Sequence, residues 1–153
     1  MWLPALIAGI SKSGQHLYPS LPYTAYNKMT FQDVADLHAF LSTLPVSETP
    51  SAEHELAFPF TIRRGLGLWK QLNVRSDWYL ADVGNPELQR GRYLVEALGH
   101  CAECHTPRNL TGGLDVERWM QGAPNPSGKG TIPAINSEAL GWPEDDIAYY
   151  LET

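Results

Sequence analysis

The sequence predicts a mainly α-helical protein, and three observations support this expectation. Apolar side chains recur at spacings of three and four residues in several stretches, and residues that start helices precede those stretches. No run of alternating apolar and polar residues exceeds a few positions, so strand signals are weak. With 153 residues, 43% of them hydrophobic, the chain is long enough for one ordinary domain or two very small ones.

The first expected helix spans residues 31–44. Thr30 is a good N-cap, and Asp33 places a negative charge near the positive end of the helix. Pro45 ends the periodic stretch. One apolar face recurs at helical spacing, comprising Val34, Leu37, Leu41 and Leu44.

The next stretch, residues 50–80, is less regular and is expected to be a connector. Pro50 and Pro59 interrupt it, and residues 62–72 have the apolar spacing of a short helix. Gly65 and Gly67 weaken that helix because glycine is a poor helix former.

A third helix is expected from Pro86 to about Gly99, because Asn85 can cap it and proline suits the first helical position. A long irregular loop follows, rich in glycine and proline, of a kind that is uncommon unless it serves a function. The final helix is expected to begin at Pro143. The side chains that it is expected to bury are Ile147, Tyr150 and Leu151.

The pentapeptide between the third helix and the loop has the pattern Cys-x-x-Cys-His. Cys101 and Cys104 are the only cysteines of the chain, so a disulfide scaffold is excluded unless they pair with each other. Two cysteines three apart in a helical turn can reach both vinyl groups of a haem. The next residue, His105, then lies beneath the iron as an axial ligand. The motif therefore predicts one covalently attached haem c.

Two other chemistries use the same residue types. A thioredoxin-like redox pair would require a preceding strand in a βαβ context, which the sequence lacks. A zinc site would require about four ligands, and the remaining histidines have no zinc-finger spacing to the cysteines.

Composition limits the other possibilities. A net charge of −6 does not indicate nucleic-acid binding. No apolar run approaches the roughly 20 residues that cross a bilayer. Residues 1–10 are apolar but lack the charged start of a signal peptide, so no working signal peptide is expected.

Residues 87–151 resemble the class I cytochrome c fold, which has a helix, the Cys-x-x-Cys-His motif and a glycine-rich loop. Gly141-Trp142 then opens the helix GWPEDDIAYYLE. In this class an indole at such a place donates a hydrogen bond to a haem propionate. The resemblance implies that role for Trp142, and simple packing at the helix start is the alternative.

Residues 14–44 resemble the part of the same fold in which the axial methionine loop leads into the C-terminal helix. By this resemblance Met29 is an axial ligand of an upstream haem that this chain lacks, whereas Met120 is expected to pack. The stretches HLYPSLPYTAYNKM and CAECHTPRN are similar to the multihaem cytochrome c subunits of membrane-bound alcohol, gluconate and fructose dehydrogenases. Those subunits carry several Cys-x-x-Cys-His motifs, and this chain has one.

The resemblance thus implies the end of one haem domain joined to the beginning of the next. Residues 1–49 correspond to the methionine loop and C-terminal helix of a preceding domain, and residues 50–80 to a connector. Residues 81–153 correspond to a class I haem domain that stops before its own axial methionine. A second arrangement stays open, in which the two pieces complement each other and Met29 serves the haem on His105.

By the same resemblance the chain is an electron carrier with no catalytic residue of its own. It implies a dehydrogenase subunit as electron donor and a quinone or terminal oxidase as acceptor, on the periplasmic side of the bacterial inner membrane. Association with the membrane would come through the complex. Two other functions stay open: a haem enzyme or gas sensor with an open sixth position, and a zinc-binding or structural module.

Overall fold

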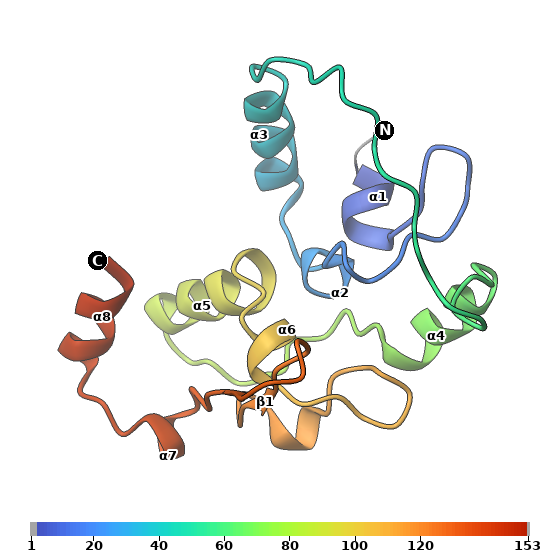
Figure 1. Ribbon diagram of the computed structural model, residues 1–153. Helices are drawn as coiled ribbons and strands as arrows, with labels where there is room; N and C mark the ends of the chain where they lie inside the picture. Colours follow the sequence, from blue (N-terminus) through green and yellow to red (C-terminus); the bar gives the residue numbers. More distant parts are fainter. Residues whose placement is uncertain (1–2, 153) are drawn as a thin grey trace. The chain divides into compact units, whose positions relative to one another are not determined.

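A computed structural model of the protein describes residues 3–152 (Figure 1). The chain divides into two compact units, the first ending at His100 and the second beginning at Cys101. Outside the described residues lie Met1 and Trp2, which begin the apolar stretch 1–10, and Thr153. Both units are built mainly from helices, which confirms the predicted mainly α class.

The named elements of the first unit are all helical, and irregular segments join them. It contains α1 (Leu3–Ala8), α2 (Tyr23–Tyr26), α3 (Phe31–Leu41), α4 (Gly65–Asn73), α5 (Pro86–Tyr93) and the π-helical turn η1 (Leu94–Leu98). Helix α2 packs against both α1 and η1. The buried apolar residues of this unit are Leu6, Tyr23, Ala25, Val34 and Ala97.

The caps of α3 and α5 form as predicted. The Thr30 side chain accepts the Asp33 N–H at 3.1 Å, and the Asn85 side chain accepts the Leu88 N–H at 2.8 Å. Helix α3 ends at Leu41, three residues earlier than expected, and continues as hydrogen-bonded turns up to Leu44. Helix termini commonly loosen in this way.

Two side chains tie α5 and η1 to the connector before them. The carboxylate of Glu96, only 2% exposed, accepts the N–H groups of Tyr79 at 2.8 Å and Leu80 at 3.0 Å. The guanidinium of Arg92 donates to the carbonyl oxygens of Leu80 at 2.8 Å and Ala81 at 2.9 Å. Connector and helix are therefore joined through peptide groups.

The second unit consists of short helices joined by a long loop. Its elements are α6 (Ala102–His105), the 3₁₀ turn η2 (Val116–Arg118), β1 (Ala123–Pro124), β2 (Thr131–Ile132), α7 (Ser137–Leu140) and α8 (Glu144–Glu152). The two strands pair antiparallel, with Ala123 opposite Ile132. Gly122 has φ of +81°, and a Cβ there would lie 2.7 Å from the Ile132 carbonyl oxygen, so the close turn requires glycine.

Helix α8 forms where it is expected, but its predicted burial is wrong. Tyr150 is 68% exposed and Leu151 is 78% exposed, and only Ile147 is half-buried. Apolar periodicity identifies which face of a helix is apolar. It does not say whether the chain supplies another element to cover that face.

The boundary between the two units falls after His100, whereas the expected domain limits lie at residues 49 and 80. The compact units are defined by the contacts that residues of this chain make with one another. The expected limits are instead the positions at which the chain would correspond to the ends of whole cytochrome domains. Those limits therefore stay a prediction. Among residues 3–152, no helix has the length and apolar character that crossing a membrane requires.

Candidate functional site

The cysteine motif forms a single helical turn at the start of the second unit. The N–H groups of Cys104 and His105 both point to the Cys101 carbonyl oxygen, at 3.3 and 3.1 Å. Residues three apart on a helix lie on one side of it, so both thiols face the same way. Both cysteines are free, Cys101 half-buried and Cys104 exposed.

The imidazole of His105 is held by a backbone group far along the chain. Its Nδ1 lies 2.8 Å from the carbonyl oxygen of Pro133. A carbonyl oxygen can only accept, so Nδ1 must carry the proton and donate. The neutral ring then keeps its lone pair on Nε2, which is the atom available to ligate a metal.

The loop that carries Pro133 is itself bonded to the turn that carries His105. The Gly122 N–H donates to the His105 carbonyl oxygen at 2.7 Å. The Met120 N–H donates to the buried hydroxyl of Thr106 at 3.0 Å, and the Met120 carbonyl oxygen accepts the Ile135 N–H at 2.9 Å. Motif and loop are therefore joined by hydrogen bonds, and the Pro133 carbonyl oxygen, which accepts the hydrogen bond from His105 Nδ1, has a fixed position.

Met120 is buried within this structure, with 5% of its surface exposed. Its backbone has φ of +56°, which is unusual for a residue other than glycine. Its N–H and carbonyl groups both take part in the loop network. These contacts agree with the packing role expected for Met120.

Trp142 belongs to the second unit and precedes α8. It is 49% exposed, and its ring lies edge-on to that of Tyr150, with centroids 5.8 Å apart. The indole is thus half open to a ligand or solvent rather than enclosed in a core. Its expected bond to a haem propionate stays a prediction.

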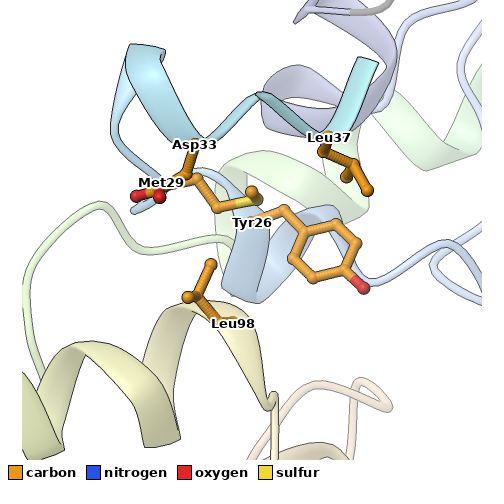
Figure 2. A pocket seen from close by; sticks show the side chains of 5 residues that line it. All are labelled: Tyr26, Met29, Asp33, Leu37 and Leu98. Carbon is orange, nitrogen blue, oxygen red and sulfur yellow. The ribbon is translucent and has the colours of Figure 1, made fainter. Parts of the chain in front are cut away.

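Met29 belongs to the first unit, where it lines a cavity of about 310 Å³. Figure 2 shows the side chains around this cavity, drawn from α2, from α3 and its approach, and from η1. The lining is mostly apolar with one carboxylate, and consists of Tyr26, Met29, Asp33, Leu37 and Leu98.

The residue after Met29 is tied to α5 through a tyrosine. The Tyr93 hydroxyl accepts the Thr30 N–H at 3.0 Å and donates to the Asp33 carboxylate, which the Thr30 hydroxyl also reaches at 2.5 Å. Donation from Thr30 and then from Tyr93 holds the pKa of Asp33 below its ordinary value. The sequence shows the Thr30–Asp33 cap, whereas nothing in it points to Tyr93.

His100, the residue before the motif, packs on this same first unit. Its ring lies edge-on to that of Tyr26, with centroids 5.7 Å apart, and its backbone has φ of +42°.

The donor set of the motif fits a covalently attached haem. Two free thiols on one side of a helical turn, followed by an imidazole with a free Nε2, are the groups that haem c attachment uses. A zinc site needs three or four ligands together. Within residues 3–152, no three side chains of His, Cys, Asp or Glu gather as a metal site.

Comparison with known proteins places relatives across almost the whole chain, although no family model matches it. A diheme cytochrome c-type protein of Cereibacter sphaeroides is 53% identical over 149 residues, which is 97% of this chain and 50% of that protein. The fructose dehydrogenase cytochrome subunit of Gluconobacter japonicus is 40% identical over 162 residues, covering 97% of this chain and 32% of the subunit.

The cytochrome c subunit of a quinone-dependent alcohol dehydrogenase from Gluconobacter oxydans is 33% identical over 170 residues, covering 97% of this chain and 34% of the subunit. The chain thus spans half or less of the length of these relatives. The resemblance expected from the two sequence stretches is confirmed.

Proposed function

From its kinship with the cytochrome c subunits of dehydrogenases, we propose that the chain carries single electrons through a haem c held by Cys101, Cys104 and His105. The observation that supports this most is the hydrogen bond from His105 Nδ1 to the Pro133 carbonyl oxygen at 2.8 Å. It leaves Nε2 of a neutral imidazole as an axial ligand. When bound, the haem supplies an iron that alternates between the ferric and ferrous states.

The residues of the second unit have separate tasks in this proposal. Cys101 and Cys104 form thioether bonds, which keep the group attached through repeated oxidation and reduction. The Pro133 carbonyl oxygen fixes the orientation and the tautomer of the His105 ring by accepting a hydrogen bond from Nδ1–H. Trp142 donates its indole N–H to a propionate, for which its half-exposed position leaves room.

The proposal extends to a second haem that contacts the first unit. Met29 would be its axial ligand, and the other residues of the mostly apolar cavity lining would help to hold the group. The name of the Cereibacter sphaeroides relative, a diheme cytochrome, supports two haems in the longer protein, of which this chain attaches one. In this scheme residues 1–49 close a preceding cytochrome c-like domain, residues 50–80 connect, and residues 81–153 begin the next.

The working context follows from the names of the relatives. Two of them are subunits of fructose and alcohol dehydrogenases, so we assign a dehydrogenase subunit as electron donor and a quinone or terminal oxidase as acceptor. Haem is attached to cysteines outside the cytoplasm. The site of action is therefore the periplasmic side of the inner membrane.

The test is covalent haem content. The chain is expressed with a periplasmic signal together with the attachment machinery, and its haem is measured as the pyridine haemochrome after acid–acetone extraction. One haem per chain that resists extraction, and a reversible one-electron titration, are expected. Release of all haem into the solvent would contradict attachment through Cys101 and Cys104. A haem that turns over peroxide faster than it exchanges electrons would favour the enzyme alternative.

A further inference from the structure

The connector carries large apolar side chains that are exposed. Five of them fall within residues 58–72 and are between 52% and 79% exposed. Large apolar side chains exposed within one short stretch indicate a site that binds another protein or a membrane. These exposed residues, here called the connector face, are Phe58, Phe60, Ile62, Leu68 and Leu72.

Helix α4 lies within this stretch and contacts the N-terminal segment through the side that carries Lys70, its one charged residue. Lys70 Nζ donates to the carbonyl oxygens of Ala8 at 2.7 Å and Gly9 at 2.6 Å. Gly67 lies so close to His16 that a Cβ on it would be 2.8 Å from the imidazole Nε2. Gly67 and Lys70 are three residues apart, so one face of α4 is fixed against the N-terminal segment.

The leucines of α4 point the other way. Leu68 and Leu72 are four residues apart and share a face, which at 3.6 residues per turn lies nearly opposite Gly67 and Lys70. They are 63% and 65% exposed. A surface helix normally turns its charges outward and its leucines inward. Helix α4 turns its lysine inward and these leucines outward.

The charge around the connector face is opposite in sign to that of the chain. Residues 56–76 contain no aspartate or glutamate, although the net charge of the whole chain is −6. Of their four basic residues, Lys70 is turned inward and Arg63 donates to the His16 carbonyl oxygen at 3.1 Å, which leaves Arg64 and Arg75. Arg64 stands one turn before Leu68, and Arg75 follows the helix, both with exposed side chains. Basic residues beside outward apolar ones are typical of segments that lie at the surface of an anionic bilayer.

We propose that the connector face binds directly to an anionic lipid surface, with Leu68 and Leu72 in the headgroup–acyl boundary and Arg64 at the lipid phosphates. Helix α4 has nine residues, which is too short to span a bilayer but long enough to lie on one. The docking through Lys70 keeps its outward face presented. This contact involves no redox step, so it stands or falls independently of the proposed electron transfer.

Vesicle sedimentation tests the proposal with the full haem-loaded chain. Vesicles of equal parts phosphatidylglycerol and phosphatidylcholine are compared with vesicles of phosphatidylcholine alone, at low salt and at about 0.5 M salt. We expect binding to the anionic vesicles that falls on adding salt. The double variant Leu68→Gln, Leu72→Gln should lower the partition coefficient at least tenfold, and Arg64→Gln should lower it about fivefold.

A matched control is the pair Phe40→Gln, Leu44→Gln, also four residues apart and 61% and 48% exposed in the wild type. It should bind within twofold of the wild type, and circular dichroism should show all variants folded. The proposal is overturned if the wild type prefers neither vesicle, or if the α4 double variant binds as well as the wild type. Self-association that is lost in the α4 double variant, without vesicle binding, would assign the face to a protein contact instead.

Discussion

The carbonyl oxygen of Pro133 lies 2.8 Å from Nδ1 of His105, across 28 residues of chain. This relationship decides which imidazole nitrogen can bind a metal, because the carbonyl oxygen accepts a hydrogen bond from Nδ1, which then carries the only N–H of the neutral ring. Two further hydrogen bonds fix the loop that carries Pro133. The Gly122 N–H donates to the His105 carbonyl oxygen, and the Met120 N–H donates to the Thr106 hydroxyl. The orientation of the proposed ligand is thus set by backbone groups of the loop.

Replacement of His105 should remove the axial ligand while leaving attachment intact. We expect His105→Ala to keep haem bound through the cysteines but to lose the absorption and electron paramagnetic resonance signals of histidine-ligated iron. His100→Asn is the matched control, because asparagine tolerates the positive φ of +42° at that position. If His100→Asn changes the spectra as much as His105→Ala does, the assignment of the ligand is wrong.

Replacement of the thiols should abolish covalent attachment. In the double variant Cys101→Ala, Cys104→Ala, all haem should extract into acid acetone and none should stay with the chain on a denaturing gel. Each single variant should keep one thioether, so part of its haem should survive extraction. Haem that resists extraction in the double variant would show that another residue makes the bond.

Trp142→Phe keeps most of the apolar surface and a ring beside Tyr150 but loses the indole N–H. If a propionate accepts that N–H, the free energy of unfolding should fall by about 1–3 kcal/mol and the midpoint potential should shift. Tyr150→Phe is the control, since it retains the ring contact and Trp142. A potential and a stability that are both unchanged in Trp142→Phe would mean that Trp142 only packs.

Met29 should not ligate the haem attached to this chain if it serves an upstream haem. The isolated chain should then show a high-spin or mixed ferric spectrum, bind cyanide or imidazole readily and lack the far-red band of methionine ligation. Met29→Ala should leave that spectrum unchanged. A far-red band that disappears in Met29→Ala would favour the arrangement in which the two pieces of the chain complement each other.

Asp33 should make the first unit more stable at neutral pH than in acid. Its pKa is lowered in the folded state by the hydroxyls of Thr30 and Tyr93. A carboxylate with a lowered pKa contributes stability above its unfolded pKa, and this contribution is lost as the pH falls through the folded pKa. Asp33→Asn should therefore melt at a lower temperature than the wild type at pH 7, and this difference should shrink as the pH falls below about 3.9, the ordinary pKa of an aspartate.

Asp36→Asn is the control for this effect, because Asp36 lies on the same helix and its carboxylate accepts a hydrogen bond from the neutral side chain of Gln32 at 2.8 Å. Its melting temperature should follow that of the wild type more closely at both pH values. A difference between Asp33→Asn and the wild type that is equally large at both pH values would mean that Asp33 acts by packing rather than by charge.

Local signals in the sequence were sufficient for much of the fold. Thr30, Asn85 and Pro86 act on backbone groups within three residues, so the starts of α3 and α5 could be predicted. The turn that places Cys101, Cys104 and His105 together is equally local. These features need no knowledge of distant parts of the chain.

The rest depends on contacts between residues far apart in sequence. Pro133 could not be singled out among the prolines of the loop, because its partnership with His105 requires the loop to close. Tyr93 meets Thr30 across 63 residues, and no periodicity reports such a pair. The exposure of Tyr150 on α8 was missed for the same reason, since burial depends on a covering element elsewhere.

Arg92 and Glu96 hold residues 79–81 through peptide groups, and this limits how the protein can diverge. Every amino acid except proline offers the same N–H and carbonyl group at positions 80 and 81, where the side chains of Leu80 and Ala81 are exposed. Those two positions can accept many substitutions over evolutionary time. A change at Glu96 would instead leave two amide N–H groups without their acceptor, so drift should be permitted on the connector and restrained on the helix.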